Sequence, residues 1–408
     1  MTVRPTRKPG SRRAKSKWPD FHHTGPGTLA GRYLRLFWQP VFHSADLPKG
    51  RAKPIRIMNV DYTLYRGDSG QPYLVDARCP HRGMQLAAGW VDGESVRCFY
   101  HGWTFDGAGR CTDQPAEPKP FCHKVSIGAY PCREYLGLIF AYLGGGEPPA
   151  LPSYPQFEGF EGILEHDSYF RACNYYNNAE NAADLTHSGF VHRNNPGSFD
   201  GFTDSPAMDA LESCWGVTII ARWPEQTRIS QFGMPNVFHH KAQPTDFGLA
   251  PYREFLAWWV PVDDESHIQF TVAAVRLPPE KTAQYLERRK ATLAKRDQSR
   301  LELADRVLKG ELWLDQIDPA RTDFLRLQDD IAQIGQGRIA EFANERLGQG
   351  DKAVIVLRKV WARELKALAE GRPLTDWTYD RKALEISRGE VWEQQFADSA
   401  SARSTNSA

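Results

Sequence analysis

The sequence predicts an α+β protein in which an all-β N-terminal domain precedes a second domain that mixes strands with helices. Short runs of β-branched and aromatic residues, punctuated by Gly, Asp and Pro, fill residues 26–150. The segment Gly144–Pro149 (GGGEPP) interrupts this pattern and marks the expected boundary. Beyond it, helical periodicity alternates with further strand-like runs. The length of 408 residues, with 41% hydrophobic and 25% charged residues, suits a folded protein of at least two domains.

The expected strands of the first domain are short and end at turn residues. They are Pro54–Val60, Tyr62–Arg66, Tyr73–Asp76, Val96–Tyr100 and Leu136–Leu143. In the second domain, strands are expected at Val217–Trp223, Phe255–Val262 and Ile268–Leu277. Helical patterns cover Asn177–Phe190, Glu280–Leu308 and Lys352–Glu370. Asp351 is the expected N-cap of the last helix, and Gly371 is its expected stop.

Charge is unevenly distributed along the chain. Residues 1–17 hold seven Lys or Arg and no acid, and we expect residues 1–25 to form a disordered basic tail. Residues 396–408 are rich in Ser and Ala and are expected to form a second disordered tail. The remaining body carries about −6, which argues against a nucleic-acid surface. No apolar run approaches the ~20 residues that span a bilayer, so we expect no membrane association.

The seven cysteines form no obvious disulfide framework, because their number is odd. The basic N-terminus lacks the apolar region of a secretory signal. We therefore expect a cytoplasmic protein, in which cysteines beside histidines hold metal. Five cysteines stand apart from any histidine motif and are expected to be simple buried residues: Cys111, Cys122, Cys132, Cys173 and Cys214.

The first metal motif is C-x-H, a gap of sixteen residues, then C-x-x-H. It comprises Cys79, His81, Cys98 and His101. Two loops thus each offer one thiolate and one imidazole. In a Rieske [2Fe–2S] cluster, two thiolates hold one iron and two imidazoles hold the other. The alternation of Cys and His within each loop therefore favours such a cluster.

Glycines follow both halves of this motif and would let the loops approach the cluster closely. They are Gly83 and Gly102. A Cys₂His₂ zinc site uses the same atoms, but its usual spacing places two cysteines before two histidines. Four unrelated buried residues are the remaining alternative.

The second metal motif is N-x-x-D-x-x-H-x₄-H within residues 180–192. Asn181, Asp184 and His187 are three residues apart and would share a helical stripe. Asp184 could then accept the second ring N–H of His187. His187 and His192 lie about 140° apart on a regular helix, so the helix must bend or end near Ser188–Gly189 for both to bind one ion. Two imidazoles also need a hard third ligand, which this spacing alone does not identify.

In this order, the two motifs resemble those of the oxygenase (alpha) subunit of the Rieske non-heme iron oxygenases. The resemblance covers residues 26–375. Gly25–Gly50 and Leu347–Gly371 are similar to the phthalate-dioxygenase-like branch, which includes aromatic O-demethylases and phenoxybenzoate-type oxygenases. The resemblance implies an all-β Rieske [2Fe–2S] domain over residues 26–150. It also implies a mononuclear iron catalytic domain over residues 151–395, with a mostly antiparallel sheet flanked by helices.

The resemblance also implies the remaining iron ligand. In this branch it is the aspartate of a Q-D-x₆-Q-G-x-I run, which Gln328–Ile339 fits. Asp329 is then the ligand, with the adjacent Asp330 as the alternative. Ile334–Gly335 departs from the Glu-Ser pair that is common in the branch. The implied ligands of the mononuclear Fe(II) are His187, His192 and Asp329, whereas Cys79 and Cys98 hold the outer cluster iron and His81 and His101 the inner one.

The same resemblance implies the partners. Electrons would come from NAD(P)H through a separate flavin/iron–sulfur reductase, with a ferredoxin as an optional carrier between them. The subunits would form a head-to-tail homotrimer. Asp184 would bridge His81 or His101 of one subunit and His187 of the next, and Asn181 would be a second catalytic residue beside the iron.

The implied substrate is aromatic, an aromatic carboxylate or an aryl ether, and O₂ is the co-substrate. Hydroxylation, cis-dihydroxylation and O-demethylation are all compatible with the sequence. Aromatic residues of the second domain either line the substrate pocket or belong to the core: Tyr175, Tyr176, Phe190, Phe232, Phe238, Trp258 and Trp259. His239 and His240 either contact a polar substituent or are structural. The alternative functions are a Rieske electron-transfer protein and a non-catalytic oxygenase homologue.

Overall fold

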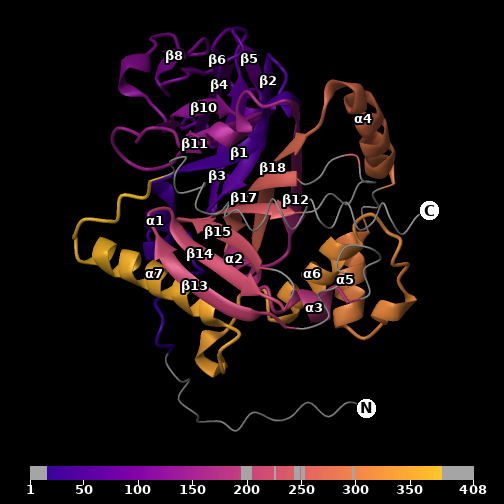
Figure 1. Cartoon of the computed structure of the whole chain (residues 1–408). Helices are drawn as coiled ribbons and strands as arrows, with labels where there is room; N and C mark the ends of the chain where they lie inside the picture. The colour runs from indigo at the N-terminus through magenta and orange to yellow at the C-terminus, as the bar shows by residue number, and fades with distance from the viewer. Residues whose placement is uncertain are drawn as a thin grey trace.

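The structure is a computed structural model that describes residues 16–193, 205–224, 227–242, 249, 253–295 and 299–378. The expected tails at residues 1–15 and 396–408, and the expected domain end at residue 395, lie outside the described residues. Within them, β-sheets of the N-terminal half stand beside a larger sheet that is covered by helices (Figure 1). The fold is therefore of the α+β class, with an all-β N-terminal domain and an antiparallel second sheet, as expected.

The N-terminal half contains three small sheets with the strand orders β1-β11-β10, β2-β3-β4-β9 and β5-β6-β7-β8. All neighbouring strands in them are antiparallel. The strands are β1 (Trp38–His43), β2 (Arg51–Ile57), β3 (Val60–Arg66), β4 (Pro72–Asp76), β5 (Trp90–Asp92), β6 (Ser95–Arg97), β7 (Thr104–Asp106), β8 (Cys111–Asp113), β9 (Ala129–Tyr130), β10 (Cys132–Tyr135) and β11 (Leu138–Tyr142).

The C-terminal half is built on one seven-stranded sheet of order β12-β18-β17-β16-β15-β14-β13, in which every neighbouring pair is antiparallel. The strands are β12 (Gly162–Arg171), β13 (Ala207–Ser213), β14 (Gly216–Arg222), β15 (Thr227–Gly233), β16 (Val237–Ala242), β17 (Arg253–Asp263) and β18 (Ser266–Arg276). Strands β12 and β13 are the two edges of this sheet.

Helices cover one face of the seven-stranded sheet. Helix α2 packs on β17 and β18, and α7 packs on β13 and β14 (Figure 1). Helix α6 contacts α2, α3 and α5, whereas α4 lies against the edge strand β12. The helices are α1 (Leu29–Arg35), α2 (Tyr175–Ala183), α3 (Ser188–Val191), α4 (Pro279–Ala294), α5 (Arg300–Leu308), α6 (Phe324–Gly335) and α7 (Lys352–Ala369).

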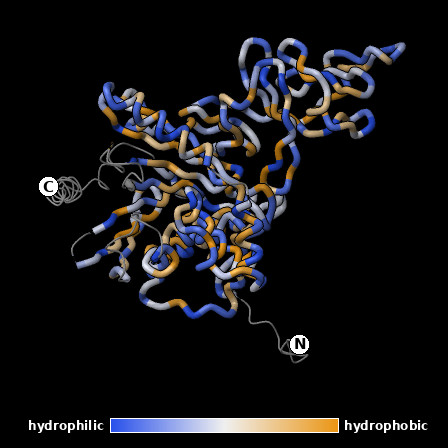
Figure 2. The backbone as a smooth tube through the Cα atoms, turned by 90° about the vertical axis from the view of Figure 1, so that its right-hand side faces the viewer, coloured by the Kyte–Doolittle hydropathy of each residue, from blue (hydrophilic) through white to orange (hydrophobic). Residues whose placement is uncertain are grey.

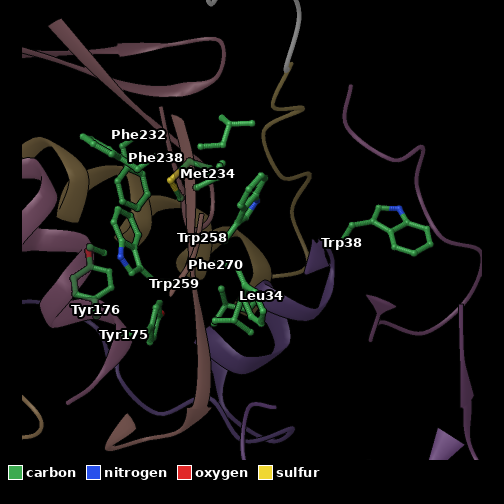
Figure 3. Close-up of a cluster of buried hydrophobic side chains, with 14 of the residues drawn as sticks. Leu34, Trp38, Tyr175, Tyr176, Phe232, Met234, Phe238, Trp258, Trp259 and Phe270 are labelled. Atoms are coloured by element: carbon green, nitrogen blue, oxygen red, sulfur yellow. The ribbon is translucent and has the colours of Figure 1, made fainter. Parts of the chain in front are cut away.

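Alternation along the strands directs neighbouring side chains to opposite faces of the large sheet. Trp259 lies on the same side as Tyr176 of α2, whereas Trp258 and Phe270 lie on the other side (Figure 3). Trp258 packs against Phe140 of β11, with ring centroids 5.7 Å apart. The sheet is therefore enclosed between the N-terminal half and the helices, and one buried core extends across both.

Hydropathy follows this layered arrangement. Hydrophobic stretches lie mainly along the strands and packed helices, whereas the peripheral loops are largely hydrophilic (Figure 2). In the part of the chain that the structure describes, none of the helices combines the length and the apolar character that crossing a membrane requires.

Most of the expected elements are present, with differences at their ends. The expected strand Pro54–Val60 is wrong in its second half, because the chain turns between β2 and β3. Met58 and Asn59 have positive φ there and donate backbone N–H groups to the carbonyls of Pro261 and Val262. These hydrogen bonds join the N-terminal half to the end of β17. The expected helix Glu280–Leu308 is two helices, α4 and α5, which are separated by a segment outside the described residues.

Residues 18–25 correct the expected basic tail. Phe21 is fully buried and stacks on Tyr176 of α2, with ring centroids 4.8 Å apart, and it also contacts Trp361 of α7. The carbonyl of Phe21 accepts a hydrogen bond from the Tyr175 hydroxyl, at 2.8 Å. These apolar contacts fix the segment in the core. The sequence did not predict this, because the residues that precede the segment are strongly basic.

Candidate metal centres

The two cysteine–histidine loops have the same backbone structure. The N–H of Cys79 donates to the carbonyl of Met84 at 2.8 Å, and that of Cys98 donates to the carbonyl of Trp103 at 2.8 Å. In each loop, the glycine four residues after the cysteine donates back to the cysteine carbonyl. Both of these glycines, Gly83 and Gly102, have φ of +74°, a conformation that glycine adopts without steric cost. Local hydrogen bonds therefore fix both loop tips.

The loops place two thiols inside and two imidazoles at the surface. Cys79 and Cys98 are 1% and 2% exposed and lie close to each other. His81 and His101 are half-buried, with ring centroids 4.5 Å apart, and His81 stacks on Trp103. This arrangement, with one sulfur pair and one nitrogen pair, fits a two-iron cluster. The cysteines occupy the inner position, so the expected outer place of the cysteine-bound iron is wrong.

Burial raises the pKa of Cys79 to about 11, and the neighbouring Cys98 contributes to the rise. Without metal, Cys79 would therefore stay protonated at neutral pH. A cluster has to displace this proton, because the thiolate is the form that binds metal.

Aromatic side chains surround the imidazole end of the loops. Trp90, Phe99 and Tyr100 are each more than half exposed. Trp90 and Phe99 pack together with ring centroids 5.5 Å apart, and Tyr100 lies 3.9 Å from the ring of His101. Exposed apolar patches of this kind mark surfaces that another molecule covers.

The second motif lies where α2 ends and α3 begins. Asp184 caps the C-terminus of α2 in an extended conformation, with φ −93° and ψ 95°. His187 precedes the single turn of α3, and His192 follows it. The break comes at Asp184, about one turn earlier than the expected site near Ser188–Gly189. It removes the angular separation that a continuous helix would impose on the two histidines.

Asp329 on α6 completes a cluster with these histidines. Its Oδ1 atom lies 3.8 Å from Nε2 of His187 and 3.4 Å from Nε2 of His192. One ligand atom from each residue falls within 4.8 Å of the other two. Two imidazole nitrogens and one carboxylate oxygen form the donor set of a 2-His-1-carboxylate iron site. Among the described residues, this is the one group of three or more His, Cys, Asp or Glu side chains whose possible ligand atoms all lie this close to one another.

Neighbouring groups fix the tautomers of both histidines. The Nδ1–H of His187 donates to the backbone carbonyl of Asp184, and the Nδ1–H of His192 donates to Oε1 of Gln328 at 3.0 Å. Both Nε2 atoms therefore keep their lone pairs for a metal. The expected bond from His187 to the Asp184 carboxylate is wrong, because that carboxylate accepts hydrogen bonds from the backbone and hydroxyl of Thr186.

The two adjacent aspartates have different surroundings. Asp330 is fully buried, and its carboxylate is held by Arg171, with Nε 2.7 Å from Oδ1, and by Arg300. Asp329 faces the histidines, and Asn181 lies 3.4 Å from its Oδ1. Burial would raise the pKa of Asp329, but the hydrogen bond and charge of His192 outweigh it and lower this pKa to about 2.

Arg171 lies behind the aspartate pair and was not found by sequence reasoning. Its Nη2 atom is 3.9 Å from Oδ2 of Asp329, and its Nη1 donates to Asn178 of α2 at 2.9 Å. The buried guanidinium of Arg171 therefore places one positive charge next to both carboxylates. Because Arg171 precedes Asp329 by more than 150 residues, no local pattern connects them. Gln328 was part of the motif that identified Asp329, but its bond to His192 had no sequence signal.

The aromatic residues of the second domain have different places. Tyr175 and Tyr176 are core residues of α2, and Trp258 faces the N-terminal half. Phe190 is exposed and lines a cavity of about 190 Å³ that Gln328 also borders. This cavity adjoins the residue bonded to Nδ1 of His192, not the Nε2 side that faces Asp329. Phe232, Phe238 and Trp259 pack together on the α2 side of the sheet (Figure 3).

Residues 37–142 match the Rieske [2Fe-2S] domain family. This range contains both cysteine–histidine loops and ends with β11. It begins after α1, which packs on α7 in the C-terminal half.

Two curated relatives match over most of the chain. One is the 5,5'-dehydrodivanillate O-demethylase oxygenase subunit of a Sphingobium species, at 29% identity over 85% of this chain and 79% of the relative. The other is the phenoxybenzoate dioxygenase subunit alpha of Ectopseudomonas oleovorans, at 29% identity over 86% of each chain.

Solved structures share the fold. The NdmA protein of Pseudomonas putida CBB5, solved with caffeine, superposes with a TM-score of 0.64 over 83% of this chain and 93% of its own, at 20% identity. The terminal oxygenase of carbazole 1,9a-dioxygenase from Nocardioides aromaticivorans IC177 gives a TM-score of 0.61 over 83% and 99%, at 20% identity. The agreement covers both halves of the fold described above.

Proposed function

We propose that this chain, which belongs to the Rieske non-heme iron oxygenases, is an oxygenase component that oxidises an aromatic substrate with O₂ and electrons derived from NAD(P)H. One observation carries the proposal: a cysteine–histidine loop pair and a 2-His-1-carboxylate cluster occur in one chain. Relatives named for dehydrodivanillate and phenoxybenzoate support an aromatic substrate, with hydroxylation, dihydroxylation or O-demethylation as the outcome.

His187, His192 and Asp329 would hold the mononuclear Fe(II), and the four loop residues would hold one [2Fe–2S] cluster. Ferrous iron with three protein ligands keeps positions open for O₂, and the cluster supplies electrons. The surrounding residues hold the donor atoms in place. Gln328 and the Asp184 carbonyl orient the imidazoles, and Arg171 places a positive charge behind the carboxylate pair.

Asp330 is a poor candidate for the iron ligand, because two arginines already occupy its oxygens. Asp329 is therefore the proposed ligand. Asn181 lies beside its Oδ1 and would orient that carboxylate. These residues act on the position and charge of the site.

Electrons would enter through the exposed aromatic patch of Trp90, Phe99 and Tyr100 next to the loop imidazoles. A reductase, or a ferredoxin between the two, is the proposed donor. Solved relatives of this fold include complexes between oxygenase and ferredoxin of carbazole 1,9a-dioxygenase. A head-to-tail homotrimer, in which the loops of one subunit meet the triad of the next, would complete the route.

Asp184 is the proposed link between subunits. Its Oδ1 is occupied by Thr186, and its Oδ2 has no hydrogen-bond partner in the described residues. Asp184→Asn keeps an oxygen for Thr186 but removes the charge. We expect this variant to retain both metals and to lose coupled turnover, measured as product formed per NADH consumed. Full coupled turnover in Asp184→Asn would exclude the bridge, whereas Asp209→Asn, at a partly exposed carboxylate on β13, should behave as the wild type.

The direct test of the function combines iron analysis with a product survey. Purified protein should contain about three irons per chain, two in the cluster and one in the triad. A Rieske electron carrier would contain about two. The same protein, supplied with a reductase, NADH and a panel of aryl ethers and aromatic carboxylates, should release formaldehyde or ring-hydroxylated products. Two irons per chain and no product from any member of the panel would contradict the oxygenase assignment.

A further inference from the structure

Two cysteines outside the cluster motif meet beside the small sheet of β5 to β8 in the N-terminal half (Figure 1). Cys111 is the first residue of β8, and Cys122 is the first residue of a single 3₁₀ turn, Cys122–Lys124. The N–H of Cys111 donates to the carbonyl of Val125 at 3.1 Å, and the N–H of Val125 donates to the carbonyl of Cys122 at 2.9 Å. Val125 thus joins the backbones of both cysteines, and both side chains pack on the same apolar cluster.

The two thiols contact each other but differ in exposure. They share a hydrogen bond, and Cys111 is 7% exposed whereas Cys122 is only half-buried. The expectation that Cys122 is a buried residue is therefore wrong. Burial raises the pKa of Cys111 to about 12, and the contact with Cys122 contributes to the rise. Cys111 stays protonated at neutral pH for this reason, so an oxidant from solvent reaches the pair through Cys122.

The other cysteines have different places, although all seven are free thiols. Two are the sulfur donors of the cluster in the proposed function, two are buried, and one is exposed on the turn between β13 and β14: Cys79 and Cys98, Cys132 and Cys173, and Cys214. A buried cysteine commonly acts as a small apolar side chain, which accounts for Cys111. It does not account for a second, partly exposed thiol in contact with the first.

The segment between the two cysteines carries an aromatic contact to the cluster motif. Phe121 approaches Trp103 edge-on, with ring centroids 5.5 Å apart, and Trp103 stacks on His81 at 4.6 Å with the ring planes 4° apart. The N–H of Phe121 donates to Oε1 of the buried Gln114 at 2.6 Å. A bond between the two cysteines would therefore close a covalent loop around the residues that support the stack on His81.

We propose that Cys111 and Cys122 are a redox-active thiol pair, which hydrogen peroxide oxidises to an intramolecular disulfide beside the Rieske cluster. Hydrogen peroxide is the product of two-electron reduction of O₂, the co-substrate in the proposed function. The inference goes beyond that function and does not need the triad, because the reaction involves only the two thiols and the oxidant.

The chemistry takes place in two steps. The sulfur of Cys122 attacks one oxygen of the peroxide, the O–O bond breaks, and the products are a sulfenic acid on Cys122 and one water. The sulfur of Cys111 then attacks the sulfenic sulfur, the S–O bond breaks, and the leaving oxygen takes the proton of Cys111 and departs as a second water. Two thiols are thus oxidised by two electrons, and one peroxide is reduced to two waters.

The test follows the thiols of the holoenzyme by mass spectrometry. We would treat the purified protein with hydrogen peroxide at a small molar excess, block free thiols with N-ethylmaleimide in denaturant, and digest it without reductant. A linked peptide pair containing Cys111 and Cys122, whose mass lacks two hydrogen atoms, should accumulate while the visible absorption of the cluster is retained. Dithiothreitol should separate the pair and restore both thiols.

Substitutions distinguish a thiol pair from two independent cysteines. In Cys122→Ser, Cys111 should remain reduced under the same treatment, because its partner provides the route to the oxidant. In Cys111→Ser, Cys122 should stop at the sulfenic acid, which dimedone traps, or proceed to the sulfinic acid. Cys214→Ser is the matched control, since it removes an exposed thiol in the other half of the fold and should leave the linkage unchanged. If Cys111→Ser does not fold, the half-buried position of Cys122→Ser keeps the comparison available.

Two results would overturn the proposal. One is oxidation of Cys122 to the sulfinic acid in the wild type while Cys111 remains free for alkylation. The other is a linkage that appears only after the cluster absorption has been lost, since the thiols would then react in a disrupted domain. Iron analysis of the same samples keeps this inference distinct from the proposed function: protein without triad iron that forms the linkage contradicts the oxygenase assignment alone, and protein with triad iron that does not form it contradicts the thiol pair alone.

Discussion

The two candidate metal centres are held by different kinds of interaction. In the cysteine–histidine loops, backbone hydrogen bonds between residues four or five positions apart fix each tip. In the triad, the donor atoms come from the two residues that flank α3 and from the middle of α6, and most of the groups that hold them are distant side chains. Arg171 of β12 contributes from a fourth element. The loops therefore depend on local backbone conformation, whereas the triad depends on single side chains that are distant in sequence.

Because of this difference, we expect the two centres to respond to different kinds of substitution. A loop fixed by its own backbone tolerates many changes of side chain but not a change of backbone conformation. A site fixed by distant side chains responds strongly to the loss of one charge or one hydrogen bond, because a buried polar group then loses its partner. Substitutions at each centre can test whether the two are independent.

The largest effect is expected at a ligand of the triad. His192→Ala removes one of two imidazoles, so we expect iron content to fall from about three to about two per chain and product formation to cease. The visible absorption of the cluster should remain, because the loops do not use this residue. Iron analysis and an absorption spectrum of the same sample measure both. Retention of three irons with activity would show that His192 is not a ligand.

The second largest effect concerns the buried cation. Arg171→Met leaves Asp330 buried with only Arg300 as a cationic partner and removes the positive charge behind Asp329. Breaking a buried pair in this way costs about 3–5 kcal/mol of unfolding free energy. Iron affinity should also fall about 10- to 100-fold, as for other groups that support a metal ligand. Denaturant unfolding and iron titration measure the two effects.

Arg326→Met is the control for this substitution. Arg326 pairs with Asp167 in a more exposed position on the same side of the sheet, and it also packs on Tyr169. Loss of this pair should cost about 1 kcal/mol or less and leave iron affinity unchanged. An equal loss of iron affinity in both variants would mean that general destabilisation, not the position of Arg171, governs metal binding.

The same contrast explains what could be predicted from sequence. The spacing of Cys79, His81, Cys98 and His101 is a local property, and the structure brings these residues together as expected. Asp329 was recognised through a motif on its own helix. Arg171 could not be recognised, because its role depends on the pairing of β12 with β18 and on the packing of α6. The sequence also placed the end of the helix too late, near Ser188–Gly189 instead of at Asp184. The backbone carbonyl of Asp184 holds His187, and a backbone interaction of this kind leaves no mark on the residue pattern.

Strands of the large sheet were missed where their sequences are polar. The edge strand β12 reads GILEHDSYFR, and several of its polar side chains are engaged by residues far along the chain, such as Arg253 at Glu165 and Arg326 at Asp167. Strand β15 carries Arg228 and Ser230 on one face, which breaks the apolar alternation. Polar residues in these two strands therefore obscured the apolar pattern, because several of them take part in ion-pair and hydrogen-bond networks.

A smaller effect is expected from the group that orients His192. Gln328→Leu removes the acceptor for the Nδ1–H of this histidine and should weaken iron binding about tenfold. Gln328→Glu keeps an oxygen at this position and should bind iron more tightly than Gln328→Leu. Iron titration of the two variants, with the cluster spectrum as an internal reference, measures the difference. Identical affinities would show that the hydrogen bond does not support the ligand.

The smallest effects are expected in the loops, and they test the backbone side of the contrast. Gly83→Ala places a methyl group at φ +74° with no atom within 4 Å, so only backbone strain opposes it, at about 1 kcal/mol. Gly102→Ala has the same φ, but its methyl group would also meet Cγ of Pro115 at 2.8 Å, and its cost should be greater. Thermal unfolding followed at the cluster absorption measures both. Neither variant should change the amount of iron bound by the triad, because no residue of these turns contacts the triad ligands in the described structure. Loss of that iron in either variant would show that the two centres are coupled within one chain.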